Sequence, residues 1–267
     1  MIRTRTLLML CAAALPLAIM TPGHAGTVLT DGDYLRVLSR ISQYNFGDTI
    51  FDNEQHLQSD TGVDFSDTAT VTRNDGNGFV ASAQSQASWA YDPSSPGLGS
   101  NFTSVSITGS STLTSSTDAF YNEEFASTGY GMSLYVTFDT DTTWSINANF
   151  EGSLTKTGDV DTVAGYSFQI LPGEGIPFPI ATYSSWMTEA GPIDLTVAES
   201  GVLAAGQYIF IMNIGVGADY IYESAASVQG ELHLTNGLVS FTPVPTPGAL
   251  ALLAVGGAAG TRRRRVA

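Results

Sequence analysis

Few residues of this chain could carry out acid–base catalysis. Glu123 and Glu124 are adjacent in the segment FYNEEF, and neighbouring side chains of a strand point to opposite faces, so they cannot form a catalytic carboxylate pair. Beyond residue 25 the histidines are His56 and His233, and we expect His233, in the alternating segment GELHLT, to be a surface residue of a strand. The sequence lacks the serine-hydrolase elbow, zinc-protease helix, phosphate loop and dinucleotide fingerprint. We therefore predict that the protein is not an enzyme.

Two aspartates suggest a metal site. Asp139 and Asp141 supply carboxylates to one short segment, and calcium binds several converging oxygen atoms. Hairpin turns favour the same residue types, so we interpret both first as turn residues. Calcium is the secondary hypothesis here, and no other cofactor is predicted.

Large aromatic side chains provide a third candidate chemistry, which is stacking against sugar rings. They are Trp89, Tyr91, Trp144, Tyr183 and Trp186. Trp89 and Tyr91 are two residues apart and share one face of a strand, which makes them the preferred ligand-binding pair. Trp144 alternates with Ile146 and is expected in the core. We nevertheless interpret Trp89 and Tyr91 first as residues that pack in the core or at its rim, and sugar binding is the second hypothesis for them.

The elements that must position these residues are strands. Apolar and polar residues alternate from Met132 to Phe138 and again from Trp144 to Phe150, on either side of the polar segment 139–142. This pattern predicts a β-hairpin. Similar alternating runs occupy 102–113, 166–171, 193–197, 207–214 and 227–235. Helical spacing of apolar residues is nearly absent.

The segment DYLRVLSRISQYNF, residues 33–46, is the exception. Tyr34, Leu38 and Ile41 would lie on one stripe of a helix, whereas Leu35, Val37 and Ile41 would point inward from a strand. We favour the strand because the surrounding segments are β.

Regularly spaced strands with glycine-rich turns predict an all-β fold, a single antiparallel β-sandwich over residues 26–242. The segment 79–96 is the only plausible internal joint. Its small residues suggest an edge strand and a loop rather than a linker.

Composition and charge limit the partners. The chain has 267 residues, 43% of them hydrophobic and 13% charged, which is sufficient for a large core. The span from Asp31 to Glu231 contains 25 acidic and four basic residues, a net charge of −21. This field repels phosphate backbones, so nucleic acid is not expected as a partner. The lone cysteine, Cys11, lies near the N-terminus, and the body therefore has no disulfide or thiol site.

The N-terminus has the three parts of a secretory signal peptide. They are the basic MIRTRT, the apolar LLMLCAAALPLAIM and the polar TPGHA. We predict that signal peptidase removes residues 1–25 by cutting between Ala25 and Gly26. The apolar part is shorter than the ~20 residues of a membrane span, which argues against a retained helix.

A phrase in the second half of the body has a family likeness. Gly201, Leu203, Gly206 and Tyr208 form the pattern G-x-L-x-x-G-x-Y. It resembles the jelly-roll-like sandwiches of bacterial exported proteins, where this phrase leads into the penultimate strands. The resemblance implies a tight turn at the glycines and a Tyr208 ring packed at the sheet rim. It implies no particular function, because such sandwiches host many.

The last 24 residues combine a proline phrase, a short apolar segment and the cluster Arg262, Arg263, Arg264 and Arg265. The apolar part from Gly248 to Gly260 would form a helix of about 20 Å, shorter than a hydrocarbon core of about 30 Å. The arginines would stay cytoplasmic by the positive-inside rule. We expect a transient membrane attachment that leaves the body outside.

This tail, residues 243–267, resembles the PEP-CTERM sorting signal. The resemblance implies an exosortase-like membrane transpeptidase that cuts near Pro245, Thr246 and Pro247 and delivers the body to the cell surface or an extracellular matrix. Thr246 stands where the family motif has glutamate. The alternative is a plain tail anchor that is never processed.

These observations predict an exported, surface-sorted, non-enzymatic structural protein of a bacterial envelope or exopolysaccharide layer. Extracellular polysaccharide would be its surroundings and partner. The alternative function is a carbohydrate-binding module on the cell surface.

Overall fold

The computed structural model describes residues 26–30, 34–45, 48–58, 62–74, 76, 78–97, 99–118, 123–173, 178–220 and 225–245, without the side chains at 34, 43–45, 48–51, 58 and 123. The predicted signal peptide with Ala25, the sorting residues Thr246 and Pro247, and Arg262 to Arg265 lie outside the described residues.

The described residues form fourteen β-strands and no helix. The strands are β1 (Thr27–Leu29), β2 (Tyr34–Asn45), β3 (Asp48–Gln58), β4 (Phe65–Asn74), β5 (Val80–Asp92), β6 (Asn101–Phe102), β7 (Ser104–Thr117), β8 (Glu123–Phe138), β9 (Thr142–Thr157), β10 (Asp161–Pro172), β11 (Ala181–Met187), β12 (Gly191–Leu203), β13 (Gly206–Tyr220) and β14 (Ala226–Pro243).

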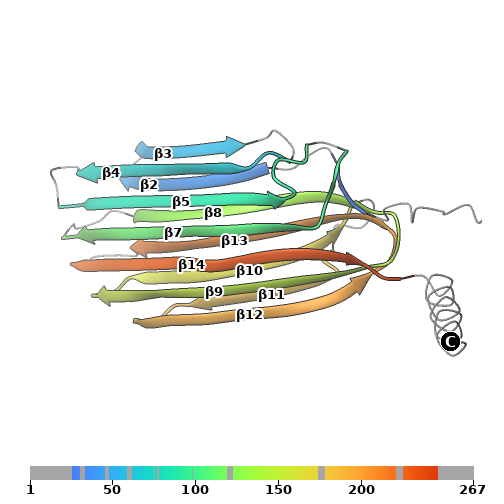
Figure 1. Cartoon of the computed structure of the whole chain (residues 1–267). Coiled ribbons are helices and arrows are strands. Elements are labelled where there is room, and N and C mark those ends of the chain that lie inside the picture. The colour runs from blue at the N-terminus through green and yellow to red at the C-terminus, as the bar shows by residue number, and fades with distance from the viewer. Residues whose placement is uncertain are drawn as a thin grey trace, which may run out of the picture.

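The strands form two antiparallel sheets that stack face to face (Figure 1). Sheet A runs in the order β11-β10-β13-β8. On the far side of β8, the first part of β8 pairs with β2, and β2 pairs with β3. The last part of β8 pairs with β1, and β1 pairs with β6. Sheet B runs β12-β9-β14-β7-β5-β4. The predicted all-β sandwich is thereby confirmed.

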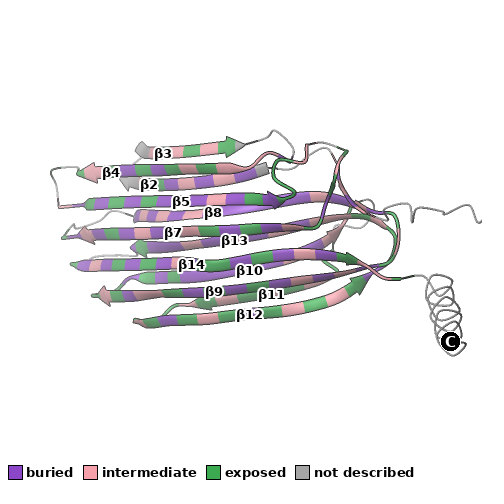
Figure 2. Ribbon diagram, in the orientation of Figure 1, coloured by how far each residue is buried: buried purple, intermediate pink, exposed green. Residues whose placement is uncertain are grey.

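Alternating burial explains why these segments are strands. In β5 every second residue from Ala81 to Tyr91 is buried against the other sheet, while the residues between them face outward. Figure 2 shows the same banding along most strands. The inner faces meet in an aromatic cluster in which Phe210 and Phe241 have ring centroids 5.1 Å apart. Each fully buried side chain of this size contributes about 1.5–3 kcal/mol.

The predicted hairpin between 132–138 and 144–150 is wrong. Both segments are strands, but β8 belongs to sheet A and β9 to sheet B. The link Asp139 to Asp141 therefore crosses from one sheet to the other. Alternation identifies the buried face of a strand and not its partner, so the same pattern fits a hairpin and a crossing link.

Two further predictions can be compared with the strands. The segment from Tyr34 to Asn45 is a strand, as favoured over the helix. The segment 79–96 contains β5, which pairs with β4 on one side and β7 on the other, so the predicted edge position is wrong. The edge strand of sheet B is β4.

The ends of the described body lie at the same end of the sandwich. Thr27 pairs with Phe138 at the end of β8, and Pro243 pairs with Thr142 at the start of β9. The Val244 N–H donates to the carbonyl oxygen of Asp141 at 2.7 Å. The chain therefore enters and leaves the body beside the link 139–141, at what we call the terminal end (Figure 1).

Candidate binding surfaces

The aromatic pair chosen from the sequence lies in the core. Trp89 and Tyr91 are 1% and 5% exposed. The Trp89 ring meets Tyr130 of the opposite sheet edge-on, with centroids 6.3 Å apart, and Tyr91 meets Phe102 in the same way. Stacking against a sugar needs an accessible ring face, so Trp89 and Tyr91 pack in the core, and the second hypothesis of a ligand-binding role for this pair is wrong. Trp144, expected in the core, is buried there.

The predicted turn aspartates are exposed at the terminal end. The Asp141 carboxylate accepts a hydrogen bond from the Ala205 N–H at 3.3 Å, so it ties its own link to the one between β12 and β13. Within the described part of the chain, no three histidine, cysteine, aspartate or glutamate side chains converge as a metal site requires.

The acid–base residues are dispersed. The Glu124 side chain is buried and lies near Tyr220 at the end of the sandwich opposite the terminal end, here called the distal end. Burial raises the pKa of Tyr220 to about 12, and its hydroxyl lies 2.5 Å from Ser115 Oγ. His233 lies on the outer face of sheet B, as predicted. His233 Nε2 lies 3.7 Å from Glu231 Oε2 on its own strand. Glu124 is buried in sheet A and His233 lies on the outer face of sheet B, so the two do not share one acid–base site.

His56 joins the two sheets at one edge. Its Nδ1 lies 2.8 Å from Asp67 Oδ2 on β4, and its Nε2 lies 3.1 Å from Glu54 Oε1 on its own strand, β3. The hydrogen bond to Asp67 raises the pKa of His56, and the same bond lowers the pKa of Asp67. Arg73 on β4 and Asp52 on β3 form a second pair at 2.6 Å. These contacts hold the β3–β4 edge together and leave His56 a structural role.

The outer face of sheet B, here called the hydroxyl face, carries rows of small polar side chains. The outward hydroxyl residues are Ser66, Thr68, Thr70 and Thr72 on β4, Ser82 and Ser88 on β5, Ser104, Ser106, Thr108, Ser110, Thr112, Thr114 and Ser116 on β7, Ser227, Thr235, Ser240 and Thr242 on β14, Thr143, Ser145, Ser153, Thr155 and Thr157 on β9, and Thr196 and Ser200 on β12. The strand register places an outward residue of each strand directly opposite an outward residue of the next, and we call such a series of partners across the sheet a row. Such a face is strongly hydrated and offers hydrogen bonds at regular intervals.

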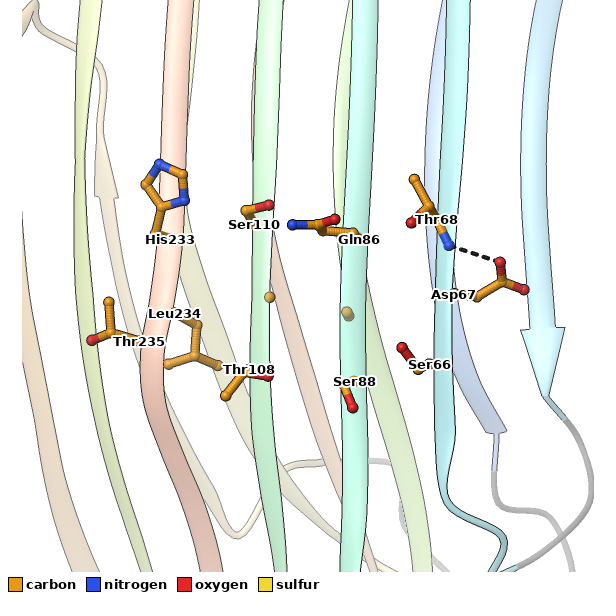
Figure 3. Close-up of a pocket in the computed structure, with 12 residues that line it drawn as sticks. Ser66, Asp67, Thr68, Gln86, Ser88, Thr108, Ser110, His233, Leu234 and Thr235 are labelled. Carbon is orange, nitrogen blue, oxygen red and sulfur yellow. Dashed lines mark hydrogen bonds between the residues drawn. The ribbon is translucent and has the colours of Figure 1, made fainter.

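A shallow depression of about 590 Å³ lies on the hydroxyl face (Figure 3). Thr68, Gln86, Ser110 and His233 form one row across it, from β4 to β14. Gly109 faces the core beneath this row, because a Cβ there would lie 2.7 Å from the Tyr130 ring. The depression is thus linked to the packing of Tyr130, which also lies at the bulge that follows Leu234 in β14.

The outer face of sheet A has a different hollow, here called the glycine groove. Register pairs Trp186, Gly165, Gly215, Gly129 and Leu38 in one row across β11, β10, β13, β8 and β2. A Cβ at Gly165 would lie 2.0 Å from the Ser185 carbonyl oxygen, so the neighbouring backbone leaves no room for a side chain. The glycines therefore form the floor of a groove of about 210 Å³.

The walls of the glycine groove combine apolar and polar groups. Trp186 is 43% exposed at one end, and Val163 and Phe125 line one side. On the other side Arg36 extends over Gly131, with its Nη2 3.4 Å from Asn213 Oδ1. The Arg36 Nε atom is buried and finds no hydrogen-bond partner among the described residues. The groove thus offers an accessible indole at one end and an incompletely paired guanidinium at the other.

The sequence indicated only part of this surface. Trp186 was among the aromatic candidates, but the spacing argument preferred Trp89. Arg36 and the groove were not predicted. The available signal was glycine at outward positions of three strands, at Gly129, Gly165 and Gly215.

Comparison with known proteins adds no assignment. No family model matches the chain, and no curated protein matches it. In the described part of the chain there is no helix that is long and apolar enough to cross a membrane.

Proposed function

We propose that this protein is a non-enzymatic, surface-sorted structural component of a bacterial envelope or exopolysaccharide layer. In this proposal a signal peptide exports the chain, the tail from 243 to 267 holds it at the membrane, and an exosortase-like enzyme processes the tail near Pro245, Thr246 and Pro247. The body would be a jelly-roll-like form of the sandwich that stands outside the membrane.

The observation that carries the proposal is the common position of the two ends of the body. Thr27 and Pro243 both lie beside the link 139–141. Because the tail leaves the body at this end, the body can stand away from the membrane without obstructing the tail, and the predicted point of signal-peptide cleavage lies at the same end. Both outer faces and the distal end then remain free to contact the surrounding layer.

Fractionation of cells that express the full chain tests the sorting. We expect the body at the cell surface in a form that lacks the arginine cluster. A variant with Arg262, Arg263, Arg264 and Arg265 all changed to glutamine should pass through the membrane and accumulate as soluble exported protein, because the positive charge that halts transfer is gone. The same location and mass for both chains would overturn the sorting proposal.

A carbohydrate-binding module is the second candidate. The glycine groove favours it, because an exposed tryptophan beside a floor without side chains can accept the flat face of a sugar ring. A module of this kind would attach the protein to polysaccharide without chemical turnover. Its test is direct binding, described below.

A further inference from the structure

We propose that the glycine groove binds an acidic polysaccharide, with one sugar ring over Trp186 and a uronate carboxylate at Arg36. This inference deepens the second candidate function above. It does not depend on how the protein reaches the cell surface. It rests on the shape of the groove, the accessibility of one indole, and the charge around one guanidinium.

The glycine groove is long and shallow. Its floor row runs across five strands from Trp186 to Leu38, a distance of about 19 Å at 4.8 Å between strands. Its volume of about 210 Å³ is below the roughly 300–1,000 Å³ of pockets that enclose a whole ligand. A long, shallow groove suits a polymer that lies along the floor with one side in water.

A peptide strand fits this groove less well than a sugar chain does. Peptides that bind sheets usually add to an edge, where unpaired N–H and C=O groups form hydrogen bonds with them. The groove crosses the middle of sheet A, where β8, β10 and β13 are each paired on both sides. A peptide lying across these strands would find few backbone partners for its own amides. A sugar chain needs only stacking and a few polar contacts.

The charged side chains near the groove favour an acidic ligand. The body carries a net charge of −21 between Asp31 and Glu231, with four basic residues in total. Two of the four, Arg36 and Arg40, point outward from sheet A near the groove, and Arg40 lies over the Phe125 ring at 5.7 Å. Among the described side chains of this face, the acidic ones are Asp161 and Asp219, and Asp219 is the register partner of Phe125, so both lie on the same side of the groove as Arg40. The register row that contains Arg36 holds no acidic residue. The Arg36 side of the groove is therefore basic on a molecule that is acidic overall.

The guanidinium of Arg36 is incompletely hydrogen-bonded. Its contact with Asn213 is long, at 3.4 Å, and its buried Nε has no partner in the described residues. Arginine presents its donors in a planar fork that matches a carboxylate. A uronate carboxylate in the groove would accept hydrogen bonds from the Nη groups of this fork, and the Asn213 side chain would remain available for a sugar hydroxyl.

The experiment compares trigalacturonate with its methyl ester, which keeps the same rings without the charge. Trimannuronate serves as a second acidic probe, and the peptide (Glu-Pro)4 represents an acidic peptide ligand. Binding to the full body is measured by calorimetry and by the fluorescence of Trp186. We expect at least one trisaccharide acid to bind more tightly than the ester and the peptide, with an affinity that falls as salt is added.

Three variants locate the site. Trp186→Ala should weaken binding about tenfold through lost stacking. Gly217→Val should weaken binding by a similar factor, because it narrows the groove. A Cβ at Gly217 is tolerated, since its nearest neighbour is Val163 Cγ2 at 3.3 Å and the Ser127 and Ala126 atoms lie at 3.7 and 3.8 Å. Arg36→Gln should remove most of the preference for the acid over the ester. Val202→Ala, which removes a 62% exposed side chain from sheet B, is the matched control and should bind as the unchanged protein does.

The outcomes are separable. Failure of both acidic trisaccharides to bind, tighter binding of the peptide, or equal affinities in the Trp186→Ala and unchanged proteins would each overturn the proposal. Melting temperatures of the variants confirm that each is folded. A negative result here leaves the sorting experiment unaffected, because that experiment reports the location of the protein and not its ligand.

Discussion

The two outer faces of the sandwich differ although both belong to antiparallel sheets of similar strand length. The hydroxyl face of sheet B carries serine and threonine in register, with the acidic Glu151, Asp194 and Glu231 and, among its described side chains, no arginine or lysine. The outer face of sheet A carries Trp186, Arg36 and a glycine floor. One face is uniform and hydrated, and the other has a distinct shape and charge. The difference suggests that contact with the bulk of a hydrated layer and recognition of a particular ligand are separated between the faces.

The largest difference between the faces is expected when a glycine beneath or within each hollow is replaced, because the two replacements should change the free energy of unfolding by different amounts. Gly109→Val should lower the free energy of unfolding by about 3 kcal/mol, because the added atoms meet the Tyr130 ring and the Gln86 carbonyl oxygen. The melting temperature should fall by roughly 6–12 °C. Gly217→Ala on sheet A should change the free energy by less than about 0.5 kcal/mol. Equal losses in both variants would mean that the two hollows have the same packing origin.

The stability of the β3–β4 edge, where His56 joins the two sheets, should depend on pH, and this effect should be smaller than that of the glycine substitutions. The pKa of His56 is raised above its ordinary 6.5, so its contribution is present below that pH and is lost as pH rises through the folded value. The pKa of Asp67 is lowered from 3.8, so its contribution is present above that pH and is lost on acidification. The pair is therefore most stabilising between about pH 4 and 6.5.

Hydrogen exchange of the β3 and β4 amides measures this effect. Protection should decrease between pH 6 and 8 after correction for intrinsic exchange, and His56→Gln should remove the dependence. Because the His56 side chain is 34% exposed, solvent screening should keep the change below about 1 kcal/mol. An unchanged pH dependence in the variant would assign the effect to another group.

Fluorescence quenching should distinguish the faces with no change in stability. The protein has three tryptophans, and Trp89 and Trp144 are buried while Trp186 is exposed. Acrylamide is neutral and is not repelled by the acidic body, so it should quench the Trp186 emission selectively. Trp186→Phe should remove most of the quenchable emission. Quenching that persists in this variant would show that a core tryptophan is accessible.

The smallest effect is expected on the hydroxyl face. Ser110→Ala removes one hydroxyl from the row of Thr68, Gln86 and His233 and should change the free energy of unfolding by less than about 0.5 kcal/mol in urea titration. A loss above about 1 kcal/mol would show that the rows act cooperatively, and it would weaken the contrast between the faces.

The sequence predicts strands better than it predicts surfaces. Alternation located the strands around Met132 and Trp144, because burial of one face imposes a period of two. It could not show that these strands lie in different sheets, since partner choice depends on contacts distant in the chain. Tyr208 did pack at a rim as its motif implied, against Phe138 at 5.3 Å, because that contact is fixed by the adjoining turn.

The candidate site was harder to predict for the same reason. Trp89 and Tyr91 do share a face, as their spacing requires, but spacing alone does not identify the face that is buried. The glycine groove depends on the alignment of Gly129, Gly165 and Gly215, which come from three strands. Their register is set by whole-sheet pairing, so no local pattern could reveal it.

The position of β14 has a mechanical consequence. This strand leads directly to the tail, and it pairs with β9 on one side and β7 on the other over nearly all of its 18 residues, about 60 Å. A force on the tail would act along the strand and load both hydrogen-bond ladders in shear, so many bonds would have to break together. A body held at its faces by a surrounding layer and pulled at Pro243 would therefore resist extraction through a strand that is paired on both sides along nearly all of its length.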